Sequence, residues 1–260
     1  MTVRLKFVVL LLALLVTAAP ALAQEGAQHS VAFDGLRFSY DAALASGVAI
    51  SAQSGSQPDV FPPDPWRSEF LLYTARPIPE SIWDAVGAVR VYPAADLAAH
   101  EATAAVLDQL QTLLADRPDL AAFGASLAEE NSLTLPFLPV LPAGQIIRAR
   151  AEYVDSPALS GIRYVTAYSE AAEPFTADAF VYTFLGISAD GGTVVSVIID
   201  LSVAGFPAEL EPIDDLGAFV DRLPEYLAES TARLNEAAPE SFTPSLALAD
   251  ALVESLAFDS

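Results

Sequence analysis

The feature that most constrains this chain is a run of four strand patterns joined by short connections. These predicted strands cover residues 145–153, 161–169, 179–188 and 193–201. The last two are separated by Ala189-Asp190-Gly191-Gly192, and an aspartate followed by glycines is typical of a tight β-hairpin. We therefore expect this region to form a largely antiparallel sheet.

Strand and helix patterns also precede this run. Earlier strand patterns cover residues 31–40, 47–51, 69–74 and 88–92. The stretch 53–65, rich in serine, glycine and proline, predicts a loop. Apolar residues at three- and four-residue steps predict a helix over 94–116, which Pro118 ends, and a proline-rich apolar connection follows over 135–142.

The C-terminal part is predicted to be helical. Asp214 and Asp215 suit the N-cap of a helix, Pro224 begins or kinks a second segment, and residues 245–256 form a last amphipathic helix. Strands outnumber helices, and the helices follow runs of strands. We therefore expect an α+β fold, a largely antiparallel β-sheet with helices packed on it, in a single domain over 31–260.

The first 23 residues have the architecture of a secretory signal peptide. Arg4 and Lys6 give a positive start, residues 7–16 are apolar throughout, and small residues ending at Ala23 suit signal peptidase. The apolar run is shorter than the roughly 20 residues that span a bilayer, so we expect cleavage after Ala23 and no membrane insertion afterwards. Residues 24–30 would then be a flexible mature N-terminus of a protein secreted to the cell envelope or extracellular space.

Charge and cysteine content narrow the classes of partner. The chain has 34 acidic against 12 basic side chains and a formal net charge of −22, and Lys6 is its single lysine. Such a field repels phosphate backbones and anionic lipid head groups, so we expect no nucleic acid and no membrane surface as partner. Because the chain has no cysteine, it can form no disulfide and carry no lipid-modified cysteine. Core packing must hold the fold together.

Few residues suit catalysis. Histidine occurs only at His29 and His100, and the chain contains no thiol, no G-x-S-x-G motif, no phosphate-binding glycine loop and no two-histidine metal motif. Carboxylates at 129–130 and within 209–215 could supply oxygen ligands to Ca²⁺, but neither group has the spacing of a calcium loop. We predict no resident cofactor or metal. A carboxylate-dependent hydrolase, assisted by calcium, is the alternative.

Three arginines define the predicted binding site. Alternation along the first strand of the four-strand run places Arg148, Arg150 and Glu152 on one face. A turn to the next strand would set Glu152 opposite Arg163 on that face. Guanidinium groups suit a carboxylate or another acidic ligand, whereas the alternative is a ladder of ion pairs within the fold. A register slip of one residue would scatter the cluster over both faces.

Three segments combine glycines, aromatic residues and prolines at fixed spacings. They are G-I-R-Y-V-T-A-Y at 161–168, Y-T-F-L-G-I-S-A-D-G at 182–191 and F-T-P-S-L at 242–246. Their pattern resembles a family of uncharacterised bacterial secreted and lipid-anchored proteins, over residues 85–256. The resemblance implies a sheet backed by helices and no known activity. Without the acylated cysteine of the lipid-anchored members, the chain would be released or held by a partner.

These features together predict a secreted, acidic, non-catalytic binding module. The absence of catalytic motifs and the arginine-bearing hairpin carry this prediction, and the expected partner is an envelope or extracellular protein or an acidic ligand. The alternatives are the carboxylate-dependent hydrolase and a structural envelope component that self-associates.

Overall fold

The computed structural model describes residues 27–55, 65–75, 77–124, 133–210 and 212–259. The predicted signal peptide lies outside the described residues. The strands are β1 Gln28–Phe33, β2 Leu36–Asp41, β3 Gly47–Gln53, β4 Arg67–Tyr73, β5 Gly87–Pro93, β6 Gly144–Asp155, β7 Leu159–Ser169, β8 Phe180–Ser188, β9 Thr193–Val203, β10 Phe242–Thr243 and β11 Ala257–Phe258. The helices are α1 Ala94–Ala98, α2 Glu101–Asp116, α3 Leu216–Glu236 and α4 Leu246–Glu254, with short 3₁₀ turns η1 Ile82–Asp84, η2 Leu120–Phe123 and η4 Pro239–Ser241.

The strands form two antiparallel sheets. The larger sheet has the order β3-β4-β5-β9-β8-β7-β6, with β10 added beside β9, and the smaller has the order β1-β2-β11. Each pairing between described strands is antiparallel. With the helices packed on these sheets, the predicted α+β fold is confirmed.

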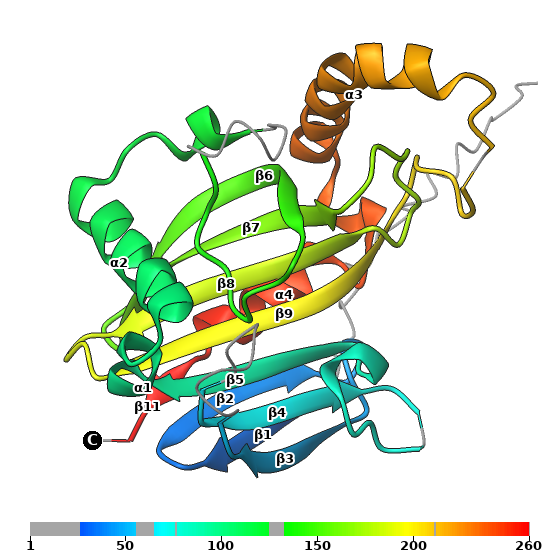
Figure 1. Cartoon of the computed structure of the whole chain (residues 1–260). Helices are drawn as coiled ribbons and strands as arrows, with labels where there is room; N and C mark the ends of the chain where they lie inside the picture. The colour runs from blue at the N-terminus through cyan, green and yellow to red at the C-terminus, as the bar shows by residue number, and fades with distance from the viewer. Residues whose placement is uncertain (1–26, 56–64, 76, 125–132, 211, 260) are drawn as a thin grey trace, which may run out of the picture.

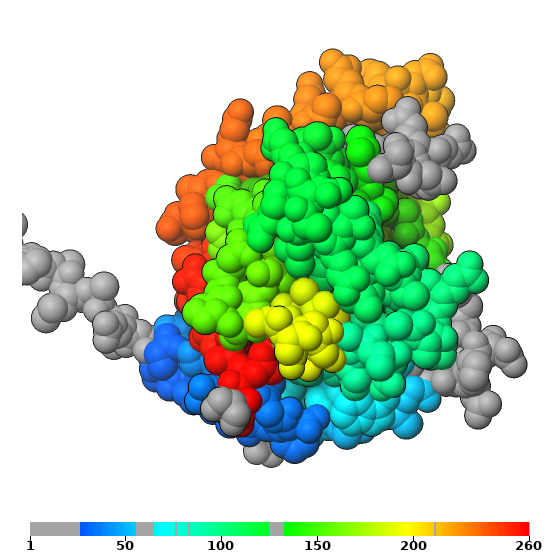
Figure 2. Space-filling view, turned by 90° about the vertical axis from the view of Figure 1, so that its left-hand side faces the viewer, coloured from blue at the N-terminus to red at the C-terminus, as the bar shows by residue number. Residues whose placement is uncertain are grey.

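Apolar side chains cover both faces of the larger sheet. One face packs against the smaller sheet and α4 in a core that includes residues from Leu36 to Leu256. The other packs against α1, α2 and the connection before β6, around Tyr92, Leu110 and Tyr164. Figure 1 shows α2 in front of the larger sheet and α4 behind it. In Figure 2 the C-terminal residues, in red, lie between the blue N-terminal hairpin and the yellow-green strands, where β11 pairs with β2.

The N-terminal strand is a hairpin and not the single strand predicted over 31–40. β1 begins at Gln28, and Asp34 (φ 52°) and Gly35 (φ 77°) turn the chain before β2. Two successive positive φ angles make a tight hairpin turn, for which Asp-Gly is a favoured sequence. The predicted flexible N-terminus is wrong from Gln28 onward because pairing with β2 holds these residues. The residues before Ala27 lie outside the described residues.

The helix predicted over 94–116 is two helices, α1 and α2. Ala99 and His100 separate them, and His100 has extended backbone angles (φ −123°, ψ 128°) that interrupt the helical hydrogen bonds. Thr103 Oγ1 donates to the backbone oxygen of His100 at 3.2 Å, which supports the new helix start. Arg117 (φ 48°) adopts the left-handed conformation that ends many helices, directly before the predicted stop at the following proline.

The helix α3 begins where its predicted cap lies. Asp215 Oδ1 accepts a hydrogen bond from Ala218 N at 3.0 Å. α3 continues through Pro224, and Figure 1 shows it changing direction along its length. A proline inside a helix removes one backbone hydrogen bond and bends the axis. The sequence predicts that Pro224 begins or kinks a second helical segment. The structure instead has a single helix, Leu216–Glu236, that bends.

Candidate functional site

The β6–β7 hairpin pairs Glu152 with Arg163, as the sequence predicts. Arg163 bonds to Glu152 Oε2 at 2.6 Å and to Asp250 Oδ1, on α4, at 2.5 Å. Asp250 also accepts a hydrogen bond from the Tyr182 hydroxyl at 3.0 Å. Burial raises the pKa of Asp250, and the positive charge of Arg163 opposes that shift. Arg163 thus belongs to an ion-pair ladder within the fold, the alternative to an acidic-ligand site.

Arg148 does not share a face with Arg163, whereas Arg150 lines the same small hollow as Arg163 and Glu152. Two register shifts interrupt the pairing of β6 with β7, one after Gln145 and one after Ala149. Each shift adds a residue to β6 and reverses the face of the side chains that follow. Arg148 stands opposite Thr166, on the face covered by α2, whereas Arg163 lies on the face covered by α4. The prediction of one common arginine face is therefore wrong for Arg148, which lies on the opposite face.

Arg148 is buried and fastens η2 to the sheet edge. Its residue is 2 % exposed. Its Nε donates to Phe123 O at 2.9 Å, a terminal nitrogen donates to Gln145 O, and its backbone N donates to Gly124 O at 2.9 Å. Burial lowers the pKa of this guanidinium. The two guanidinium bonds described here go to backbone carbonyls of the fold, which gives Arg148 a structural role.

Arg150 closes the end of α3. It has a left-handed backbone (φ 55°) at the second bulge. Its guanidinium donates to Asn235 O at 3.1 Å and Ala237 O at 2.8 Å, and it lies 5.9 Å from the centre of the Phe242 ring. A cation is favourable at a helix C-terminus, where backbone carbonyls lack helical partners. All three predicted binding arginines therefore have partners inside the fold.

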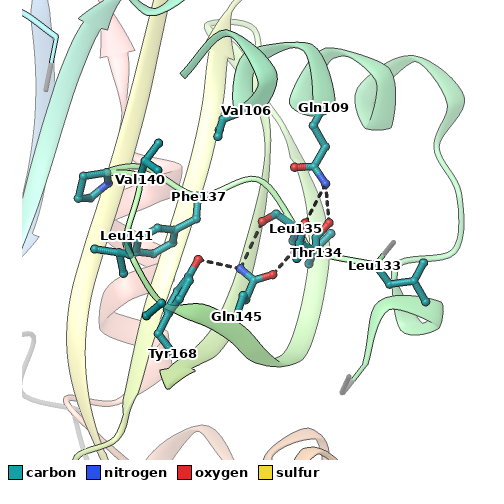
Figure 3. Close-up of a pocket in the computed structure, with 13 residues that line it drawn as sticks. Val106, Gln109, Leu133, Thr134, Leu135, Phe137, Val140, Leu141, Gln145 and Tyr168 are labelled. Carbon is teal, nitrogen blue, oxygen red and sulfur yellow. Dashed lines mark hydrogen bonds between the residues drawn. The ribbon is translucent and has the colours of Figure 1, made fainter. Parts of the chain in front are cut away.

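A cleft that the sequence analysis did not single out lies beside the connection that precedes β6. Figure 3 shows this cleft between α2, the connection and Tyr168 of β7. Gln145 holds the connection in place because Leu135 N donates to its Oε1 at 2.8 Å and its Nε2 donates to Leu135 O at 3.2 Å. The Nε2 also lies 3.1 Å from the Tyr164 hydroxyl and 3.0 Å from the Tyr168 hydroxyl. The side-chain amide thus pairs with Leu135 as a neighbouring strand would.

Several polar groups of the cleft keep unused hydrogen-bonding capacity among the described residues, Tyr168 and Gln109 among them. The Tyr168 hydroxyl accepts a bond from Gln145 and donates to no described atom. Gln109 donates from Nε2 to Thr134 O at 2.6 Å, which leaves its Oε1 as an acceptor. Burial raises the pKa of Tyr168, so its phenol stays protonated and remains a donor. The cleft therefore offers both a donor and an acceptor to a ligand.

The lining of the cleft carries no charge. Its volume is about 250 Å³, and none of its 13 described lining residues is ionic. These residues are Val106, Gln109, Leu133, Thr134, Leu135, Phe137, Pro139, Val140, Leu141, Ala143, Gly144, Gln145 and Tyr168. None of these lining side chains could pair with an ion, and an unpaired buried ion costs far more free energy than a neutral group that is hydrogen-bonded. The lining selects for an uncharged ligand.

A second cavity of about 170 Å³ adjoins this cleft. Both are lined by Phe137, Pro139, Leu141 and Tyr168. Among the described residues, Asp200 is the one charged side chain of the second cavity. The Phe137 and Tyr168 rings lie 4.9 Å apart, centre to centre, so this aromatic pair forms a wall common to both spaces.

Sequence reasoning missed this site because its residues come from separate elements. The available signal is the apolar connection over 135–142, whose prolines and leucines by themselves indicate only a link between elements. Alternation indicates that Gln145 is a strand residue and that Tyr168 is a core residue of its strand rather than part of a ligand platform. Their convergence on one connection depends on the register of β6 against β7, which local patterns do not determine.

The carboxylates considered for calcium do not converge where the structure describes them. Within the described ranges, no group of three or more His, Cys, Asp or Glu side chains is placed to hold a metal ion. Asp215 caps α3, and Glu129, Glu130 and Glu211 lie outside the described residues. None of the helices in the described part of the chain is both long and apolar enough to cross a membrane.

Comparison with known proteins gives no match. A scan against protein-family models finds none, and searches of curated proteins and of solved structures find none either. The resemblance to secreted and lipid-anchored bacterial proteins therefore stays a prediction.

Proposed function

We propose that this protein is an exported binding module that holds a small uncharged ligand in the cleft of Figure 3. One observation carries the proposal. In a chain with 34 acidic side chains, the cleft is lined by uncharged residues, with a donor and an acceptor among apolar groups. Apolar pockets with a few well-placed polar groups are the usual form of small-molecule sites. The proposed ligand is neutral and replaces the acidic ligand expected for the arginine cluster.

The polar groups specify the chemistry of this ligand. The Tyr168 hydroxyl would donate to a carbonyl or hydroxyl oxygen of the ligand, and Gln109 Oε1 would accept from an N–H or O–H group. The side chains of Val106, Leu133 and Phe137 would cover its apolar part. A volume of about 250 Å³ is below the range of about 300–1,000 Å³ typical of drug-sized sites. The ligand class is therefore a small amide or hydroxyl compound on an apolar frame.

Export supports a role outside the cytoplasm. The predicted signal peptide would direct the chain out of the cytoplasm. The net negative charge of the chain favours its solubility. The chain has no nucleophile elbow, thiol or two-histidine motif, which favours binding over turnover.

The test is a titration of residues 24–260 with a panel of small neutral amides, sugars and alcohols, alongside charged analogues of each. We expect binding of neutral members, by calorimetry and by shifts in the amide NMR spectrum around Tyr168. Tyr168→Phe should weaken that binding by about tenfold, since it removes one hydrogen bond to the ligand. Tyr153→Phe is the matched control, because Tyr153 donates to Pro118 O away from the cleft. Binding that prefers charged analogues, or that ignores Tyr168→Phe, would overturn the proposal.

The hydrolase alternative has one specific observation in its favour. Glu152 and Asp250 both contact Arg163, and burial raises the pKa of Asp250, as a general acid requires. The hollow beside them has a volume of only about 40 Å³, which has room for water but not for a sugar ring. Turnover on a glycan or peptide panel that disappears in Asp250→Asn would favour the hydrolase, and no turnover across the panel would set it aside.

A further inference from the structure

The two edge strands of the larger sheet, β3 and β6, differ in how far other segments cover their backbone. At the β6 end, Arg148 N donates to Gly124 O at 2.9 Å and Arg150 N donates to Asn235 Oδ1 at 2.6 Å. Two register shifts also interrupt β6. Bulges and covering segments are the means by which proteins protect a sheet edge from unwanted pairing. The β6 edge is therefore protected.

The β3 edge has none of these protections within the described part of the chain. β3 pairs with β4 without a register shift, from Gly47 opposite Tyr73 to Gln53 opposite Arg67. No described backbone group outside β4 forms a backbone hydrogen bond with β3. In an antiparallel edge strand, alternate N–H and C=O groups point away from the single neighbour. β3 thus presents a row of available backbone donors and acceptors at the lower margin of the molecule in Figure 1.

The side chains of β3 make this edge suitable for a second strand. Its sequence, G-V-A-I-S-A-Q, contains no charge and no proline. Ile50 is 42 % exposed and stands opposite Phe70, whose ring has an edge-on contact with Phe33, itself 43 % exposed. Uncharged, unbulged edges with exposed apolar side chains are strong candidates for strand pairing.

We propose that two copies of this protein pair through β3, antiparallel and edge to edge, about a two-fold axis at Ile50. In this register Val48 lies opposite Ala52 and Ala49 lies opposite Ser51, so small uncharged side chains face one another. The two Ile50 side chains meet on the face of the sheet that also carries Phe70. A two-fold contact of this kind uses the same surface on both copies and therefore closes at a dimer. Every pair in this register joins uncharged side chains, so two copies of this acidic chain can meet at β3 without placing like charges opposite one another.

The charge of the chain predicts how this pairing responds to salt. Each copy carries a formal charge of −22, so long-range repulsion opposes the dimer although the paired strands are neutral. Salt screens repulsion between exposed charges, whereas strand hydrogen bonds and apolar contacts do not depend on it in this way. The dimer should therefore strengthen as ionic strength rises.

The test is sedimentation equilibrium of residues 24–260 at low and high salt, with hydrogen exchange of the β3 amides. We expect a reversible dimer at high salt and slower exchange in β3 as protein concentration rises. Ile50→Lys should raise the dissociation constant by about tenfold or more, because two like charges would meet at the axis. The matched control is Val220→Lys on α3, where Val220 is 46 % exposed.

Three results would overturn the proposal: a monomer at all concentrations at high salt, a dimer that tolerates Ile50→Lys, or a dimer disrupted equally by Val220→Lys. Circular dichroism would verify that both variants are folded. The ligand titration of the cleft is a separate measurement, so failure of one proposal leaves the other to its own test.

Discussion

At the scale of single residues, the side-chain amide of Gln145 holds the connection that lines the cleft. Gln145 satisfies both backbone groups of Leu135, which is 2 % exposed. A buried backbone group without a partner costs about 1–3 kcal/mol. The Gln145 side chain therefore pairs with the backbone N–H and C=O of the connection, as the backbone of a neighbouring strand would in a sheet.

Gln145→Leu should reduce the free energy of unfolding by about 2–4 kcal/mol, because it leaves the buried Leu135 N without its partner and leaves Leu135 O only the 3.4 Å bond from the Tyr164 hydroxyl. The measurement is urea unfolding followed by circular dichroism. Gln109→Leu is the control, since Gln109 is half-buried and, among the described residues, bonds to Thr134 alone, so its loss should cost about 1 kcal/mol. Equal losses in the two variants would contradict the special role of Gln145.

A buried ion group provides the second residue-scale prediction. Glu69, 2 % exposed, accepts from Arg67 Nε at 3.2 Å and from Arg90 Nε at 2.6 Å. Glu69→Gln would leave two buried guanidinium groups without their shared carboxylate, a change that costs about 3–5 kcal/mol. Glu152→Gln should cost less than about 1 kcal/mol, because its side chain is 61 % exposed. Chemical denaturation of both variants makes the comparison, and similar losses would count against this account.

At the scale of elements, the turn of the β8–β9 hairpin is determined by the residues within it. Asp190 Oδ1 accepts from Gly192 N at 2.9 Å, and Gly191 takes a positive φ of 74°. The sequence predicted this turn because both features are properties of neighbouring residues. The bulges of β6 have no such signal, since they depend on what packs against each face.

Gly191→Ala should lower stability by about 1–2 kcal/mol, because an alanine in the left-handed region is strained. A new Cβ there would meet no atom within 4 Å, so the loss is conformational and not steric. Gly192→Ala is the matched control, with no positive φ and a nearest contact of 3.4 Å to Asp190 Oδ1, and should cost less. Thermal unfolding of both variants provides the measurement; a larger loss for Gly192→Ala would refute the argument.

At the scale of the whole molecule, two aspartates should bias stability in opposite directions with pH. Burial raises the pKa of Asp250 above 3.8, so the folded state binds that proton more readily than the unfolded state. The hydrogen bond from Arg117 holds the pKa of Asp155 below 3.8, so there the unfolded state binds the proton more readily. Wild-type stability relative to Asp250→Asn should therefore rise as pH falls from neutral toward 3.8. Relative to Asp155→Asn it should fall as pH drops below 3.8.

The measurement is urea unfolding of the three proteins over a pH series. The Asp155 effect should be small, because its side chain is 53 % exposed and solvent screens the pair. If the stability difference from wild type changed with pH in the same direction for both variants, the two aspartates would not have the opposite pKa shifts described here.

The α+β class, the strands of the four-strand run and the pairing of Glu152 with Arg163 follow from the sequence by itself. These features depend on alternation and turn chemistry, which act between neighbours in the chain. Tertiary contacts decided where Arg148 and Arg150 lie, because each bulge reverses the faces of β6 to satisfy distant partners. They also made the cleft, since Gln145 and Tyr168 meet the connection only after the sheet has formed. The register of two strands depends on many weak contacts across the fold, so a short segment of sequence does not determine it.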